Sequence, residues 1–128
     1  MIYAAAFVAI KDNKILLTRT RDNTIWYQAG GKIEQDETPI QTIVRELKEE
    51  LSLELTTDDM RYLGNITTDN HDRTTIVSLE CFTANINQEI KPCAEISAIK
   101  WFDFDDTEFV APAVLEVIAK YKSGEWQI

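Results

Sequence analysis

The chain has few residues that could build a zinc site or a thiol-based centre. Two cysteines and one histidine occur among its 128 residues. Cys81 and Cys93 are too far apart for a zinc-binding pair, and nothing in the sequence suggests export, so we expect two reduced thiols in a cytoplasmic protein. His71 lies in the polar stretch 67–75, which is typical of a hairpin loop. We expect it at the surface, where a loop histidine could also touch a substrate.

Positive charge and long apolar runs are scarce as well. Thirteen basic residues are outnumbered by 22 acidic ones, which gives a net charge of −9. Nucleic acids and anionic membranes require a basic binding surface, so we expect neither as a partner. No run of 18 apolar residues occurs, which excludes a membrane-spanning helix. The apolar residues 1–10 lack a basic leader and precede Lys11 and Asp12, so they indicate a strand rather than a signal peptide.

No linker, internal repeat or low-complexity segment divides the chain. With 45% apolar and 27% charged residues, a chain of this length can bury the core of one domain but not of two. We therefore expect a single domain over residues 1–128.

The order of periodic segments predicts an α/β protein. Thr38 has the features of a helix N-cap, with Pro39 at the first helical position and Gln41 completing a capping box. A closing amphipathic helix is expected over 113–122, and Asp12 and Asn13 are expected to form a turn. Strands are expected over residues 3–10, 15–19, 25–28, 61–67, 75–84 and 96–102. Strands that alternate with two helices imply a sheet sandwiched between them.

An acidic cluster on the first helix is the best indication of function. Glu46, Glu49 and Glu50 stand at i, i+3 and i+4, so a helix stacks their carboxylates on one face. Carboxylates so close together repel, and they suit a hard divalent cation such as Mg²⁺ or Mn²⁺. The alternative is a solvated glutamate face with Arg45 and Lys48 as ion-pair partners.

The ordered spacing from residue 31 to residue 53 closely resembles the signature of the Nudix hydrolases, which include MutT-like nucleoside polyphosphate hydrolases. That signature reads Gly, five residues, Glu, seven residues, Arg, Glu, apolar, any, Glu, Glu, any, Gly, apolar. The chain departs from it at Ser52, where the family usually has glycine, and Ala29 stands where the family often has proline. The resemblance implies the Nudix α/β/α sandwich, with a mixed β-sheet between helices. It also implies Mg²⁺- or Mn²⁺-dependent hydrolysis of a nucleoside diphosphate linked to another moiety.

The resemblance assigns roles to individual residues. It implies that the carboxylates of the acidic cluster bind metal and act in catalysis, with Glu46 as the expected general base and Glu49 or Glu95 as alternatives. The carbonyl of Gly30 is implied as a further metal ligand. Glu95 resembles an extra metal-approaching glutamate of MutT-type members, although it could equally be an exposed strand-edge residue. The structural part of the box comprises Gly31, Glu37 and Arg45, the last two as a buried pair that holds loop to helix.

The substrate is less well defined than the chemistry. Arg19, Arg21 and Lys32 surround the predicted glycine loop and could clamp phosphates, or they could be solvated surface charges. Four aromatic residues could stack on a base, although strand aromatics more often belong to a core; they are Trp26, Tyr27, Phe82 and Phe109. We expect a small-molecule nucleotide substrate, namely a nucleoside di- or triphosphate. The sequence is also compatible with a homodimer.

Two other functions are compatible with the sequence. One is a Nudix-fold module that binds or senses a nucleotide without cleaving it, which the departures at Ala29 and Ser52 favour. The other is a small acidic interaction domain that presents its glutamate face to a basic partner.

Overall fold

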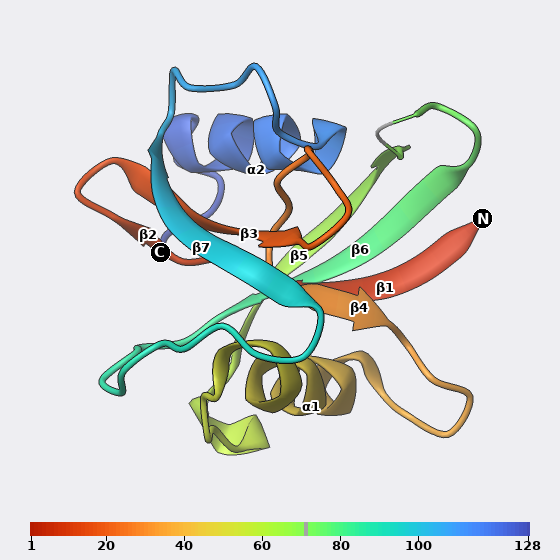
Figure 1. The fold of residues 1–128 in the computed structure, drawn as a ribbon, viewed down its shortest axis with the longest axis vertical. Coiled ribbons are helices and arrows are strands. Elements are labelled where there is room, and N and C mark those ends of the chain that lie inside the picture. Colours follow the sequence, from red (N-terminus) through yellow and green to blue (C-terminus); the bar gives the residue numbers. More distant parts are fainter. Residues whose placement is uncertain (71) are drawn as a thin grey trace.

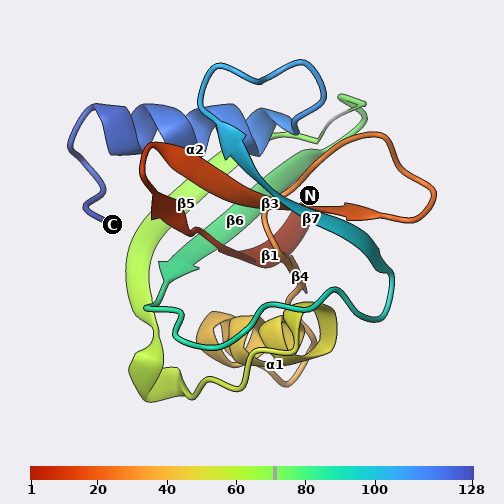
Figure 2. The same cartoon turned by 60° about the vertical axis from the view of Figure 1, so that its left-hand side comes forward.

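The structure is a computed structural model that describes residues 1–70 and 72–128. The expectation for His71 falls outside the described residues. Helices α1 (Pro39–Leu51) and α2 (Pro112–Lys122) lie on opposite sides of the strands, as Figures 1 and 2 show. In chain order the strands are β1 (Ile2–Phe7), β2 (Ile10–Lys11), β3 (Lys14–Thr20), β4 (Gly30–Lys32), β5 (Arg61–Asp69), β6 (Ile76–Thr83) and β7 (Ile96–Asp103). A short 3-10 helix, η1 (Thr57–Asp59), precedes β5.

The strands form two sheets rather than the single sheet expected. One is mixed and four-stranded, in the order β4-β1-β6-β5, with β1 and β6 parallel and the other pairs antiparallel. The other is antiparallel and three-stranded, in the order β2-β3-β7. The expected α/β layering and mixed strand pairing are therefore confirmed, and the single sheet is corrected to two.

The expected strand over residues 3–10 is divided between the two sheets. Strand β1 ends at Phe7, and the chain then crosses to β2. The crossing is fixed by backbone bonds to both sides, because Val8 N–H donates to the Phe82 carbonyl (2.8 Å) and Leu16 N–H donates to the Ala9 carbonyl (3.0 Å). Residues 5–9 are buried, and their side chains alternate between the core beside α1 and the core beside α2, whereas Tyr3 is exposed.

The expected strand over residues 25–28 is wrong. This segment makes isolated bridges only, from Tyr27 to Thr18 and from Trp26 to Val110. Successive residues bond to different neighbours, β3 on one side and the approach to α2 on the other, so no continuous ladder forms. The following glycines, Gly30 and Gly31, do form a strand, since β4 pairs with β1. Sequence patterns did not predict this strand.

Helix α1 begins at Pro39, where expected, and α2 begins at Pro112, one residue before the expected start. The Thr38 hydroxyl accepts from the Gln41 N–H (3.4 Å), and the Gln41 side chain accepts from the Thr38 N–H (3.0 Å). Apolar residues of α1 pack beneath the four-stranded sheet, and those of α2 pack on the opposite face. The expected turn is present, with positive φ at Asp12 and Asn13. Neither helix in the described part is long and apolar enough to cross a membrane.

Candidate active site

The glycine loop lies tightly against both the sheet and the first helix. Gly30 has φ +147° and pairs with Ala6 of β1, and a Cβ atom on it would collide with the Ala5 carbonyl oxygen. A Cβ atom on Gly31 would lie 2.6 Å from Oε1 of Glu46. The two glycines therefore allow the loop to reach the helix that carries the acidic cluster.

Glu50 is the glutamate that the glycine loop holds directly. Its Oε1 accepts a 2.8 Å hydrogen bond from the Gly30 N–H. Burial raises the pKa of Glu50 to about 7, and repulsion from Glu46, Glu49 and Glu95 acts in the same direction, while the Gly30 hydrogen bond opposes the shift. The Glu50 carboxylate is thus partly desolvated, and the Gly30 N–H does not fully offset its burial and the repulsion from the neighbouring glutamates.

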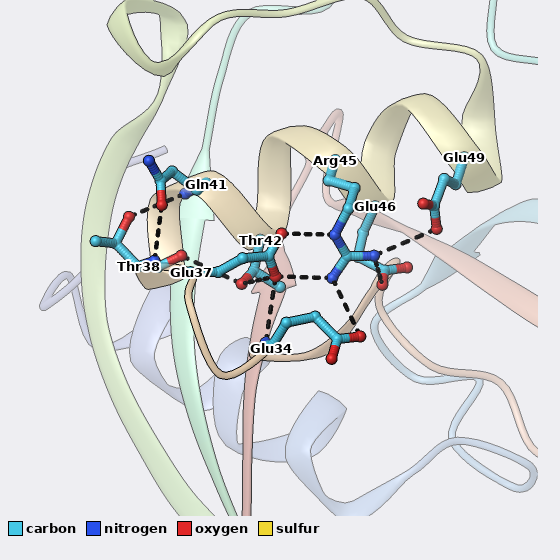
Figure 3. Close-up of polar contacts among 8 residues, drawn as sticks. All are labelled: Glu34, Glu37, Thr38, Gln41, Thr42, Arg45, Glu46 and Glu49. Carbon is cyan, nitrogen blue, oxygen red and sulfur yellow. Dashed lines mark hydrogen bonds and ion pairs between the residues drawn. The ribbon is translucent and has the colours of Figure 1, made fainter.

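Arg45 ties the loop before α1 to the helix (Figure 3). Its Nε and Nη2 atoms donate to the two oxygens of Glu37, at 2.6 and 2.9 Å. Thr42 Oγ1 and the Glu34 N–H also donate to Oε1 of Glu37, at 2.9 and 3.2 Å. The Arg45 guanidinium holds the pKa of Glu37 at about 2, well below its usual range. The structure thus brings together the two residues expected to form the structural pair.

Arg45 also contacts two glutamates of the acidic cluster. Its Nη1 donates to Oε1 of Glu46 (2.8 Å) and to Oε2 of Glu49 (3.3 Å). The Glu46 side chain is 14% exposed and that of Glu49 is 53% exposed. Burial raises the pKa of Glu46, although the contact with Arg45 opposes the shift. Both carboxylates face the guanidinium (Figure 3), so one arginine partly neutralises two carboxylates of the cluster.

The three α1 glutamates suit a divalent cation by their chemistry, although they do not converge on one point. Glu46 and Glu49 accept from Arg45, and Glu50 accepts from the Gly30 N–H. In residues 1–70 and 72–128, no three carboxylate, imidazole or thiol groups are gathered closely enough to hold an ion. The groups available beside the glycine loop are nevertheless hard oxygen donors on adjacent turns of one helix, as Mg²⁺ and Mn²⁺ prefer. The raised pKa values of Glu46 and Glu50 reflect desolvation and local repulsion that a bound cation would relieve. The residues therefore fit such an ion by their chemistry.

Ser52 ends the helix in the conformation that the usual glycine would supply. It adopts a left-handed conformation, with φ 58° and ψ 28°. Its Oγ lies 2.9 Å from the Cys93 sulfur, and the Cys93 N–H donates to the Glu50 carbonyl (3.0 Å). The departure from glycine at this position therefore leaves the end of α1 next to Glu50 with the geometry the family signature implies.

The outer candidate residues lie apart from this cluster. Glu95 is exposed, and its carbonyl accepts from the Arg21 N–H (3.2 Å). The Arg19 guanidinium lies over the Trp26 ring, 4.9 Å from its centroid, and Lys32 is exposed on β4. The negative charge of Glu95 contributes to the raised pKa of Glu50. None of the three basic residues, Arg19, Arg21 and Lys32, lines the cavity beside Glu50.

A cavity of about 230 Å³ opens beside Glu50. Residues of β1, β3, β5, β6 and β7 and the start of α2 line it, together with Tyr27, Gln28 and the two loop glycines. Gln28 is 8% exposed. Neither periodicity nor motif spacing identified Gln28 as a site residue. The one feature of the sequence that could have done so is its position as a polar residue in the apolar segment before the glycines.

The four aromatic residues considered for base stacking are dispersed. Tyr27 lines the cavity, whereas Phe82 is buried in the core next to α1. Trp26 packs edge-on against Phe102, with ring centroids 4.9 Å apart. Phe109 is 51% exposed and does not line the cavity. Tyr27 is therefore the aromatic residue of this set that lines the cavity.

Comparisons with known proteins agree with the geometry. A NUDIX domain model matches residues 1–121. The CTP pyrophosphohydrolase of Escherichia coli is 43% identical over 60 residues, which cover 44% of this chain and 44% of that protein, so the match spans less than half of that relative. A MutT-like protein of Streptomyces ambofaciens is 28% identical over 118 residues, covering 92% of this chain and 71% of that protein.

A solved structure carries the same fold over nearly the whole chain. The MutT NUDIX hydrolase from Burkholderia pseudomallei superposes with a TM-score of 0.76 and 19% identity, covering 92% of this chain and 95% of that one. The expected fold class and family are thereby confirmed. The chain belongs to the NUDIX domain family, the Nudix hydrolases that its glycine, glutamate and arginine spacing predicts.

Proposed function

We propose that the protein hydrolyses a nucleoside di- or triphosphate, or another nucleoside diphosphate linked to a further moiety, in a reaction that requires Mg²⁺ or Mn²⁺. The observation that carries this proposal is the 2.8 Å hydrogen bond from the Gly30 N–H to Glu50, which lines the cavity and lies on the same helix as Glu46 and Glu49. Family membership and the relative named as a CTP pyrophosphohydrolase support a nucleotide substrate.

The metal-binding groups in this proposal are the carboxylates of Glu46, Glu49 and Glu50 and the carbonyl of Gly30, with Glu95 as an outer candidate. When bound, the cation supplies charge neutralisation for the diphosphate and makes the attacking water more acidic. The Gly30 N–H fixes the orientation of Glu50, and the ion pair of Glu37 with Arg45 holds the loop against the helix.

Glu46 is the proposed general base. Its side chain is 14% exposed and lies against Gly31 of the glycine loop, and a carboxylate held beside the reacting groups can take the proton of the attacking water. As the water oxygen bonds to phosphorus and the bond to the leaving phosphate breaks, the water proton passes to this carboxylate. Arg19, Arg21 and Lys32 lie outside the cavity, so we assign them to phosphates that extend beyond it.

A nucleotide panel tests the proposal. Purified protein is incubated with the ribonucleoside and deoxyribonucleoside triphosphates and with nucleoside diphosphate conjugates, with Mg²⁺, Mn²⁺ or EDTA, and products are separated by ion exchange. We expect metal-dependent release of pyrophosphate or a nucleoside monophosphate from at least one substrate. Metal-dependent binding without turnover on any member would identify a nucleotide-binding module instead.

A further inference from the structure

Gln28 carries a polar group that the protein leaves unsatisfied. Its side chain is buried, and its amide nitrogen has no hydrogen-bond partner within residues 1–70 and 72–128. No other buried side-chain nitrogen or oxygen in that described part lacks a partner. Buried amides are almost always hydrogen-bonded, so an orphan donor of this kind points to a partner supplied from outside the chain.

The backbone on both sides of Gln28 is held in place. Tyr27 and Thr18 exchange two backbone hydrogen bonds, at 2.7 and 2.9 Å, and the Ala29 carbonyl accepts from the Phe7 N–H (2.8 Å). The orphan donor is therefore attached to a segment anchored to β3 before it and to the end of β1 after it. Such anchoring suits a residue that must present one hydrogen bond to a ligand.

The cavity that Gln28 lines is mostly apolar. Its apolar walls come from β1, β6, β7 and the start of α2, and include Ala4, Ala6, Val77, Leu79, Ile96 and Pro112. The Thr18 hydroxyl in the same lining already donates to the Tyr27 carbonyl (3.3 Å). Charge enters the described lining at Glu50 and at the exposed Asp69, which lies 3.5 Å from Arg73. A neutral donor among apolar walls favours a neutral, flat ligand with a hydrogen-bond acceptor on its edge.

We propose that Gln28 is a specificity-determining residue that reads the nucleobase, its amide N–H donating to a ring nitrogen or carbonyl oxygen of the base. This inference rests on the proposed function, since it assumes that the nucleoside part of the substrate occupies the cavity beside Glu50. The carboxamide also carries an acceptor next to its donor, so it can pair with a base edge that offers the complementary two groups. It gives the site a means of distinguishing bases that the phosphate end cannot provide.

Kinetics with a matched pair of variants test the role. Gln28→Met keeps the length of the side chain and removes its hydrogen-bonding groups, and Gln127→Met makes the same change at an exposed position. For the best nucleotide, we expect Gln28→Met to lower kcat/KM by about 10- to 100-fold, chiefly through KM, and to level the ranking of the four bases. Gln127→Met should retain the rate and the ranking. An unchanged ranking in Gln28→Met overturns the inference.

A base-free probe separates recognition from a structural role. Ribose 5-triphosphate keeps the sugar and phosphates, so its kcat/KM should be the same in the wild type and in Gln28→Met. The melting temperature of the free variant should equal or exceed that of the wild type, because the substitution removes an unsatisfied buried donor. Equal losses on the base-free probe and on nucleotides, with a lower melting temperature, would mean that Gln28 only supports the fold.

Direct binding distinguishes this inference from the proposed hydrolysis. Calorimetry with a non-hydrolysable nucleotide analogue and Mg²⁺ measures the affinity whether or not turnover occurs. A wild type that binds without cleaving, and a Gln28→Met variant that binds at least about tenfold more weakly, would remove the hydrolase proposal and support base reading. Equal affinities in the two proteins would overturn base reading, even if hydrolysis is observed.

Discussion

Arg45 organises the site because it contacts groups with different tasks. Through Nε and Nη2 it holds Glu37 of the preceding loop, and through Nη1 it contacts Glu46 and Glu49 (Figure 3). A lysine could not reproduce these contacts, since a single ammonium lacks the planar array of donors that reaches several carboxylates at once. One guanidinium thus offsets part of the negative charge of Glu37, Glu46 and Glu49.

Glu50→Gln should abolish most turnover without harming the fold. The amide oxygen can still accept from the Gly30 N–H, but the variant loses a proposed metal ligand, so we expect turnover to fall by orders of magnitude. The melting temperature should be level or higher, because a partly desolvated carboxylate and its repulsion from Glu46 are removed. Steady-state assays and thermal melts check both parts, with Glu49→Gln expected to behave similarly and the exposed Glu116→Gln as control. Full turnover in both Glu49→Gln and Glu50→Gln would contradict the catalytic assignment.

Glu37→Gln should reduce acid dependence of stability. The folded-state pKa of Glu37 is about 2 against an ordinary value of 4.5, so its ionised form is favoured in the folded protein. The stabilisation is complete above about pH 4.5 and is lost as the pH falls through about 2. The variant should therefore be less stable than the wild type at pH 7, and the difference should shrink between these two values. Denaturant titrations at several pH values measure the difference in unfolding free energy between the two proteins. A difference that does not change with pH would exclude the ion pair as the source of the stabilisation.

Residue roles were predictable only where a pattern encodes them. The resemblance to the Nudix signature paired Glu37 with Arg45 and assigned Glu50 and Gly30 to one metal site, and the structure brings the members of each pair together. Gln28 and Thr42 were not predicted, because their importance depends on burial and on which neighbours satisfy their polar atoms. A single sequence gives neither piece of information directly.

At the level of elements, the start of helix α1 was predictable because it is marked locally. The capping box and proline specify that start, whereas Ser52 does not mark the end in the way that the usual glycine would, and its left-handed geometry is seen only in the structure. The segment 25–28 was mispredicted as a strand for the opposite reason. Its bridges go to β3 and to Val110, partners distant in sequence, so local preference for extended backbone did not determine whether a ladder formed.

Ser52→Gly should stabilise the protein. A left-handed residue other than glycine is strained, and relief of that strain should outweigh the greater flexibility of glycine in the unfolded chain, for a gain of about 0.5–1 kcal/mol. Ser123 provides a matched control, because it is also a helix C-cap serine but has φ −74°. Ser123→Gly should lose about 0.5–1 kcal/mol or more, since glycine offers no advantage there and the Ser123 hydroxyl also loses its hydrogen bonds to the Lys120 carbonyl (3.0 Å) and from the Glu125 N–H (3.3 Å). Urea unfolding compares the two variants, and losses of stability in both would refute the strain argument.

At the scale of the whole molecule, the two sheets create the space that the proposed function requires. The cavity is lined by strands of both sheets and by the start of α2, and small residues such as Ala4 and Ala5 on β1 leave room inside it. The sequence predicted strands between two helices but not their division into two sheets. Periodicity indicates which faces are buried, whereas strand pairing and the crossing at Val8 depend on contacts distant in the chain.

Mg²⁺ should stabilise the whole protein through the acidic cluster. At a free concentration tenfold above its dissociation constant, an ion that binds only the folded state adds about 1.4 kcal/mol, which corresponds to a rise of roughly 4–7 °C in melting temperature for a chain of this size. A net charge of −9 means that any salt also screens repulsion, so NaCl of equal ionic strength is the reference. Glu50→Gln should lose the Mg²⁺-specific rise, whereas Glu116→Gln, which alters the net charge equally on an exposed face of α2, should keep it. If both variants retain the rise, the ion binds away from the glycine loop, and the metal assignment of Glu50 is wrong.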